Sequence, residues 1–271
     1  MALSMIDTHC HVHEIEAKSG GVHTKWFADG VERTAETVLA AAHEAGVDRM
    51  IVIGTSLADS ELAVRFAQAH DNVWASIGIH PHEAKDHRSA AQKKRFAALA
   101  REPKVVAVGE CGLDYYYNLS PHDAQEELLR FQIELALAHN LPLSFHVRDA
   151  FEDFWPIFES YKNVRGVLHS FTDSQANMEH GIDLGLYIGV NGIATFPSSA
   201  AQHVIYRTIS QQRLLFETDA PFLTPVPFRG KVCEPKHVAN TAEFLARLRG
   251  ESLEELVAAS TANAEALFTL V

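Results

Sequence analysis

The segment MIDTHCH, residues 5–11, begins with apolar residues and ends with two histidines that are separated by one residue. Successive side chains of a strand point to opposite faces, so His9 and His11 would share one side and Cys10 would take the other. Similar short apolar runs recur along the chain, and longer segments with helical spacing lie between them. We predict eight strands, at residues 5–11, 49–55, 73–80, 105–110, 142–146, 166–170, 186–191 and 213–219.

The helical spacing covers residues 33–45, 57–70, 90–101, 120–140, 200–210, 234–249 and 252–268. Buried strands that alternate with helices form parallel sheets, and eight strands predict an α/β fold, a single (β/α)8 TIM barrel over residues 1–271. A doubly wound open sheet is the structural alternative. The segment 14–32 is long for a connection between a strand and a helix, and we expect it at the mouth of the barrel, which it could narrow.

The composition supports a large buried core, because 47% of the 271 residues are hydrophobic and 21% are charged. The net charge of −12 excludes a basic field over the whole molecule, so any nucleic acid must be bound locally. Three widely spaced cysteines suit a reducing compartment. No apolar run or leader suggests a membrane. We therefore expect a cytoplasmic protein without a membrane partner, and a monomer is the simplest oligomeric state.

Histidine is unusually frequent, with 16 copies. The pair His9 and His11 ends the first predicted strand, and four further donors end other strands: Glu110, His146, His169 and Asp219. In a barrel these ends converge on one mouth, at the carboxyl ends of the strands. Nitrogen and carboxylate donors in this mixture suit Zn²⁺, Mn²⁺ or a similar ion and are too rich in nitrogen for calcium. The alternative is that each histidine finds its own buried hydrogen-bond partner.

The chain resembles the TatD family of metal-dependent deoxyribonucleases, which belongs to the wider group of amidohydrolase-like metal barrels. The resemblance covers nearly the whole length. It is carried by IDTHCHVH (6–13), SIGIHPHEA (76–84), VAVGECGLDYYY (106–117), LSFHVRDA (143–150), GVLHSFTDS (166–174), YIGVNGI (187–193), LLFETDAPFLTP (214–225) and PFRGKVCEPKHV (227–238). The family fold is also a (β/α)8 barrel.

The resemblance implies two divalent metal ions, which could be Zn, Mn or Mg. One ion would be held by His9, His11, Glu110 and Asp219, and the second by Glu110, His146 and His169. Glu110 would therefore bridge the pair. Two such ions turn a bridging water into hydroxide near neutral pH and neutralise charge on a scissile phosphate. Asp219 would accept the proton of that water and pass it to the leaving oxygen, or it would serve as a ligand alone.

Four further residues are implied around the metal ions. His80 would contact the scissile phosphate or the leaving group, and it completes the predicted catalytic set of Asp219, Glu110 and His80. Arg148 and Arg229 would bind phosphate or form ion pairs at the mouth. Glu217 is grouped with these substrate-binding residues; it faces the same way as Asp219, and we expect it to tune a metal ligand from behind.

The motif around residues 114–117 leaves two questions open. Asp114 could orient a ligand histidine or cap the turn that follows it. The tyrosines at positions 115, 116 and 117 could stack on bases, although a tyrosine cluster more often packs in the core, and we expect packing here. The family usually carries Asn and an aromatic residue where this chain has Cys233 and His237, which places the substrate preference of the outer rim in question.

We expect a metal-dependent hydrolase that cleaves phosphodiester bonds of DNA and works from the 3′ end of single strands, because the mouth of a barrel is a pit. The substrate partner would be a DNA end, an oligonucleotide or a nucleotide phosphodiester. The alternative keeps the metal ions and changes the bond, as in an amide, ester or lactone hydrolase that acts on a small molecule. A scaffold protein without chemistry is a third reading, but it does not explain why all six donors are present.

Overall fold

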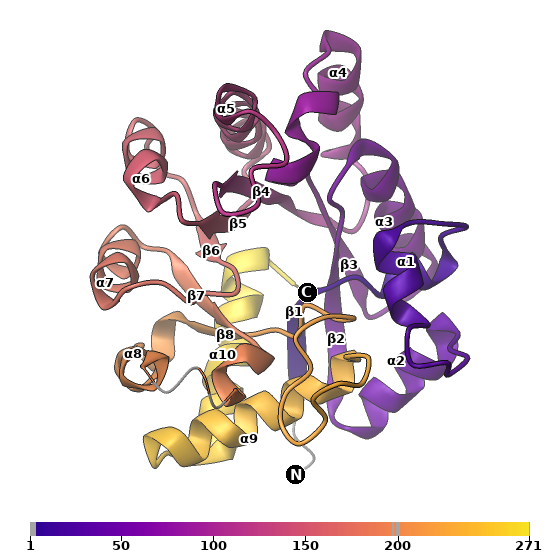
Figure 1. The fold of residues 1–271 in the computed structure, drawn as a ribbon, viewed down its shortest axis with the longest axis vertical. Helices are drawn as coiled ribbons and strands as arrows, with labels where there is room; N and C mark the ends of the chain where they lie inside the picture. The colour runs from indigo at the N-terminus through magenta and orange to yellow at the C-terminus, as the bar shows by residue number, and fades with distance from the viewer. Residues whose placement is uncertain (1–3, 197, 199–200, 271) are drawn as a thin grey trace.

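The protein folds as a (β/α)8 barrel, in which eight parallel strands alternate with helices (Figure 1). The computed structural model describes residues 4–196, 198 and 201–270. The strands follow the chain order around the barrel: β1 (Met5–Cys10), β2 (Val47–Ile53), β3 (Val73–Ile77), β4 (Val105–Asp114), β5 (Leu143–Arg148), β6 (Gly166–Leu168), β7 (Tyr187–Val190) and β8 (Leu214–Phe216). The predicted barrel is confirmed, and the open-sheet alternative is wrong.

The last strand meets the first through backbone hydrogen bonds just beyond the end of β8. The backbone N–H of Asp219 donates to the carbonyl of His9 over 2.8 Å, and the N–H of His11 donates to the carbonyl of Ala220 over 2.8 Å. Cys10 and Ala220 form a parallel bridge at the same place. The bonds that close the sheet therefore lie beside His9, His11 and Asp219.

Helices surround the strands, as Figure 1 shows. They are α1 (Gly21–Trp26), α2 (Ala35–Glu44), α3 (Leu57–Ala69), α4 (Ala90–Leu99), α5 (His122–His139), α6 (Phe151–Glu159), α7 (Gln175–Asp183), α8 (Gln202–Thr208), α9 (Val238–Arg249) and α10 (Leu253–Phe268). Sequence analysis missed α1, α6 and α7, which are short; α6 contains Pro156, and α7 contains Gly181. Residue 200, where a helix was predicted to begin, lies outside the described residues. Among the described helices, none has the length and apolar character that crossing a bilayer requires.

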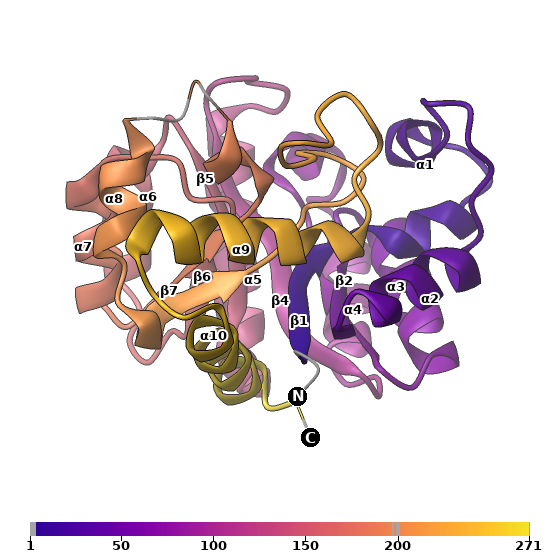
Figure 2. The ribbon, with the colours of Figure 1, turned by 90° about the horizontal axis from the view of Figure 1, so that it is seen from below.

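One end of the barrel is filled by apolar side chains. A buried cluster joins Ile6 of β1, Ile51 of β2 and Leu215 of β8 to Leu267 and Phe268 of α10. In Figure 2, α10 lies at the lower side of the barrel, whereas α1 and the loop after β8 lie at the upper end. Polar side chains that face the interior therefore have room only at the upper end, where the strands finish.

Two strand boundaries differ from the prediction in a way that affects the site. β4 continues past Glu110 to Asp114, because residues 111–114 pair with residues 145–148 of β5. Gly112 permits this close pairing: its φ is +150°, and a Cβ at this position would overlap the carbonyl oxygen of His146. β8 ends at Phe216, so Asp219 lies in a loop, where its φ of 60° is in the left-handed region.

The long connection 14–32 is held to the barrel by one buried aromatic side chain. Trp26, at the end of α1, is fully buried, and its indole Nε1 donates a hydrogen bond to the carbonyl of His11 over 3.0 Å. Arg33 then joins the end of this connection to the segment after β8, with its Nε 3.0 Å from Glu234 Oε1. The connection is therefore docked against the mouth, and Val22 of α1 lines the cavity there.

We expect Trp26→Ala to lower the free energy of unfolding by about 3–5 kcal/mol, because it removes a large buried side chain and leaves a cavity. Urea denaturation of the chelator-treated protein, followed by circular dichroism, would measure the loss. Val31→Ala is the matched control in the same connection, since Val31 is 52% exposed; its unfolding should change little. Equal stability of the two variants would contradict the anchoring role of Trp26.

Candidate functional site

A cavity of about 710 Å³ opens at the end of the barrel where the strands finish. Its lining includes five of the six predicted metal ligands together with His80: His11, His80, Glu110, His146, His169 and Asp219. The sixth ligand, His9, is 1% exposed and lies at the inner edge of the same group. The structure thus brings together all six donors that the sequence analysis selected.

The carboxylate of Glu110 lies at the centre of the group. Its Oε1 is 2.9 Å from His146 Nδ1, 3.6 Å from His80 Nε2 and 3.8 Å from His169 Nε2. Its Oε2 is 3.4 Å from His9 Nε2. The two oxygens of this single side chain therefore face different imidazoles, which is the arrangement that a bridging ligand requires.

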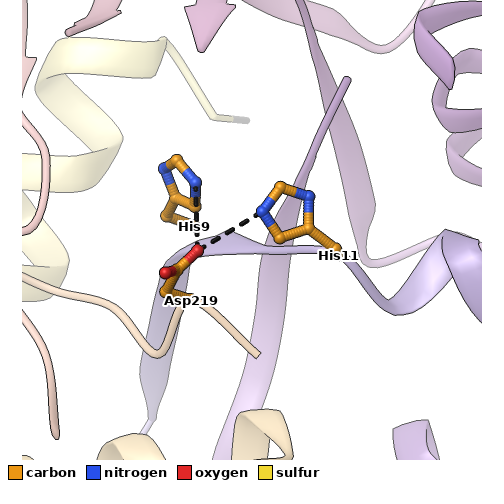
Figure 3. A group of neighbouring side chains, drawn as sticks. All are labelled: His9, His11 and Asp219. Carbon is orange, nitrogen blue, oxygen red and sulfur yellow. Dashed lines mark ion pairs between the residues drawn. The ribbon is translucent and has the colours of Figure 1, made fainter. Parts of the chain in front are cut away.

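Asp219 is the second carboxylate of the group, and it faces His9 in β1 and His11 just after β1 (Figure 3). Its Oδ1 is 3.3 Å from His11 Nε2 and 3.7 Å from His9 Nε2. The Nδ1 of His11 donates to the carbonyl of Ile53 over 2.9 Å, so its Nε2 is left with a free lone pair in the neutral ring. His9 faces both Asp219 and Glu110 and thereby connects the two carboxylates.

Carboxylates also orient two of the imidazoles from behind. His146 presents Nδ1 to Glu110, while its Nε2 lies 3.0 Å from Asp114 Oδ2. His169 presents Nε2 to Glu110, while its Nδ1 lies 3.0 Å from Glu217 Oε1. A carboxylate on the far nitrogen sets the tautomer and the direction of a metal-binding histidine. The two rings therefore point different nitrogens at the same glutamate.

Glu217 does not contact the cavity, and its predicted role in substrate binding is corrected. The side chain is fully buried behind His169, and Oε1 accepts a hydrogen bond from the backbone N–H of Ser170 over 2.6 Å. Gly189 makes room for it, because a Cβ there would overlap the Glu217 carboxylate. The alternation expected of a strand fails here since the strand ends at Phe216. The expected action on a ligand from behind agrees with this placement.

Both readings of Asp114 describe contacts that the structure contains. Its Oδ2 contacts His146, and it also lies 3.0 Å from Nε2 of His82. Its Oδ1 accepts a hydrogen bond from the backbone N–H of Tyr117 over 2.9 Å, which holds the turn that follows β4. Sequence analysis missed His82, because its distance along the chain from Asp114 gives no sign of the contact.

Burial and charge act in opposite directions on the imidazoles. Burial favours the neutral ring of His11, but its contact with Asp219 outweighs this and raises the pKa of His11 to about 9. For His146, burial is outweighed by Asp114 and Glu110, and the pKa rises to about 9. For His169, burial is outweighed by Glu217, and the pKa rises to about 9.

The pKa of His80 shifts in the other direction. Burial lowers the pKa of His80 to about 3, and the positive charge on His146 and His82 adds to this shift, against the pull of Glu110. His80 is therefore neutral near pH 7. Its Nδ1 accepts a hydrogen bond from the backbone N–H of His82 over 3.1 Å, so the proton of the neutral ring lies on Nε2, 3.6 Å from Glu110 Oε1.

The donor set fits divalent cations. Within the described residues, His9, His11 and Asp219 place ligand atoms within 4.8 Å of one another, and so do His9, Glu110 and His169. The group His80, Glu110 and His146 meets the same limit. The buried Nε2 of His9 has no hydrogen-bond partner although it faces two carboxylates. Such a buried unpaired nitrogen is expensive unless a cation occupies its lone pair.

The two predicted arginines occupy different places. Arg148, at the end of β5, lines the cavity, and its guanidinium lies 4.1 Å from the ring centroid of Tyr116. Arg229 lies 3.6 Å above the ring centroid of Phe196 and is not part of the described lining. The loop after β8 places its side chain over this aromatic ring, and its contact with phosphate stays a prediction.

The tyrosine cluster divides between packing and exposure. Tyr115 packs, with its ring stacked on His122 at a centroid distance of 3.6 Å. Tyr116 and Tyr117 are 58% and 53% exposed and line the cavity. The expectation that the cluster packs is therefore wrong for two of its three members, because β4 ends at Asp114 and the chain turns outward after Tyr115.

Comparisons with known proteins agree with this fold and donor set. A family model described as TatD related DNase matches residues 6–269. A metal-dependent hydrolase of Bacillus subtilis, YabD, is 35% identical over 268 residues, which is 98% of this chain and 99% of that protein. A 3′-5′ ssDNA/RNA exonuclease TatD of Escherichia coli is 34% identical over 240 residues, covering 86% of this chain and 92% of that protein.

The solved structures include YJJV, a TatD homologue from Escherichia coli, which superimposes with a TM-score of 0.87 at 28% identity and covers 100% of both chains. The match spans every strand that contributes a donor to the cavity, from His9 on β1 to Asp219 after β8. The chain thus belongs to the TatD related DNase family of metal-dependent hydrolases.

Proposed function

We propose that this protein is a divalent-metal-dependent nuclease that removes nucleotides from the 3′ end of single-stranded DNA or RNA. The observation that carries the proposal is the buried Glu110 carboxylate, which lies within 3.8 Å of four imidazoles. One of these imidazoles, His9, also faces the carboxylate of Asp219. Relatives that share about a third of the sequence are named as 3′-5′ ssDNA/RNA exonucleases, which supports the direction and the substrate class.

The ligand sets of the proposed ions follow from the two oxygens of Glu110. Oε2 faces His9, which with His11 and Asp219 would complete the first site. Oε1 faces His146 and His169, which would complete the second site. Two bound cations, of Zn²⁺, Mn²⁺ or Mg²⁺, would lower the pKa of a water between them and offset the charge of the phosphate.

Side chains of the cavity would then accept and donate the protons that the hydrolysis requires. In the proposed hydrolysis a water oxygen would attack phosphorus as the bond from phosphorus to the 3′ oxygen breaks, and Asp219 would accept the proton that the water loses. Asp219 is suited to this role because burial is outweighed by His11, His169 and His9, which lower its pKa and keep it ionised. His80 would donate a hydrogen bond from Nε2 to the phosphate or the leaving oxygen, and Asp219 returns the proton to that oxygen.

The shape and charge of the mouth favour a strand end over a duplex interior. The cavity is a pit at the end of a barrel, so a scissile phosphate reaches Glu110 only if the bases around it are unpaired. Arg148 is a cation in the lining and would bind phosphate by charge-assisted hydrogen bonds. A local cation is needed because the chain has a net charge of −12.

We expect the purified protein to shorten a 5′-labelled single strand stepwise from its 3′ end when Mg²⁺, Mn²⁺ or Zn²⁺ is present, and to leave a blunt duplex largely intact. A chelator should abolish the shortening, and added metal should restore it. Denaturing gels of the labelled products would show the direction. Intact strands with every one of these metals, from protein that elemental analysis shows to be loaded, would contradict the nuclease.

Glu110→Ala should lower the rate roughly tenfold or more and should reduce the bound metal from two ions toward one, because this carboxylate is proposed to hold both. Elemental analysis of the dialysed protein and a cleavage assay would measure the two effects. Glu243→Ala, on the exposed face of α9, is the control and should keep the wild-type values. Two tightly held ions in the Glu110 variant would refute the bridge.

Arg148→Ala should raise KM for an oligonucleotide roughly tenfold, since it removes a charge-assisted contact to phosphate. Arg229→Ala is a matched control, because Arg229 is also exposed and also lies over an aromatic ring but outside the cavity lining. Steady-state kinetics with a single-stranded substrate would separate them. An unchanged KM in Arg148→Ala, with normal turnover of a small ester, would favour a carbonyl hydrolase instead.

A further inference from the structure

Two adjacent aromatic side chains are exposed at the rim of the cavity. Tyr116 and Tyr117 are more than half exposed, and their rings meet edge to face with centroids 4.9 Å apart. Large aromatic side chains are normally buried because of their apolar area. Both rings belong to the lining of the cavity that contains Glu110, so a strand that reaches Glu110 can contact them.

Arg148 adds a planar cation to this pair. Its guanidinium carbon lies 4.1 Å from the centroid of the Tyr116 ring and 4.8 Å from that of Tyr117. Arg148 is itself exposed, so the stacked cation is accessible from the solvent. Aromatic rings and guanidinium planes are the surfaces on which unpaired bases stack, whichever base is present.

The pair is attached firmly to the centre of the site. The backbone N–H of Tyr117 donates to Oδ1 of Asp114, while Oδ2 of the same carboxylate contacts His146. The ring of Tyr117 also packs edge to face against His82, with centroids 5.5 Å apart. One buried carboxylate therefore sets both a proposed metal ligand and the turn that bears the tyrosines, which is a preorganised arrangement.

We infer that Tyr116 and Tyr117, together with Arg148, form a stacking subsite for the unpaired bases at the 3′ end of the strand that enters the cavity. This inference rests on the proposed function, and it specifies the part of the substrate that the protein recognises. Stacking is tolerant of sequence, so the subsite would select strands that carry terminal bases over strands that lack them. The cation of Arg148 complements the phosphates that join those bases.

The test compares binding of two strands to the metal-loaded protein. Both carry phosphorothioate linkages that slow cleavage and a fluorescent label at the 5′ end, and one lacks the bases at its 3′ end. Wild-type protein should bind the complete strand about 5- to 150-fold more tightly, which corresponds to one stacked base. The double variant Tyr116→Ala with Tyr117→Ala should lose most of this difference, because only the guanidinium of Arg148 remains to stack on a base. Fluorescence anisotropy gives each dissociation constant.

Two controls separate stacking from other effects. Leu119→Ala truncates a side chain of the same loop that is 53% exposed and lies outside the cavity lining, and it should keep the wild-type discrimination. Tyr116→Phe with Tyr117→Phe retains both rings and should restore the discrimination that the alanines remove. Thermal melting checks that all variants fold. We expect that they do, because the substituted side chains are more than half exposed.

Equal binding of the two strands by wild-type protein would overturn the subsite, and so would full discrimination by the double alanine variant. Loss of discrimination in the phenylalanine variant would also overturn it, because the hydroxyls and not the rings would then be responsible. Cleavage of ordinary strands without any discrimination would refute the subsite and leave the nuclease intact. Discrimination that depends on the tyrosines without cleavage would support the subsite and refute the nuclease.

Discussion

The burial of one carboxylate among several imidazoles is the interaction on which the rest of the site depends. Glu110 is 5% exposed, and burial alone would favour its neutral form. Contacts with the imidazoles of His146 and His9 oppose this effect, and the pKa of Glu110 lies well below its usual range. The fold must therefore supply positive charge around this side chain, either as protons on the histidines or as cations that replace them.

That requirement explains the second layer of acidic side chains. Asp114 behind His146 and Glu217 behind His169 contact the far nitrogens of the rings that face Glu110. Both are fully buried, and each makes a backbone contact as well, Asp114 to Tyr117 and Glu217 to Ser170. The same carboxylates thus contact the proposed metal ligands and hold the backbone of the loops beside them. A change in either carboxylate would affect both the site and the local fold.

The barrel brings these groups together through a small number of close backbone approaches. Gly112 lets β4 and β5 pair alongside Glu110 and His146, and Gly189 leaves the space that Glu217 occupies. The seam between β8 and β1 is closed by backbone bonds at His9 and Asp219. The ligands at this seam therefore lie beside the backbone bonds that close the sheet, whereas Tyr116 and Tyr117 lie on the turn after β4 and Arg148 is the last residue of β5.

The sequence by itself determined the barrel and the six donors, because alternating apolar runs specify parallel strands and because polar residues at strand ends must converge at one mouth. Tertiary structure alone decided the roles of residues whose function depends on where the side chain points. Glu217 and Asp219 lie two residues apart, yet one is buried behind His169 and the other faces the cavity, since the chain leaves the strand at Phe216. Arg148 and Arg229 have the same chemistry, but only the first lines the cavity, and Tyr115 packs while its two neighbours are exposed. Periodicity specifies which face of a strand a residue occupies, but in loops and at strand ends the backbone angles set that direction, and these follow from packing against residues far away in the chain.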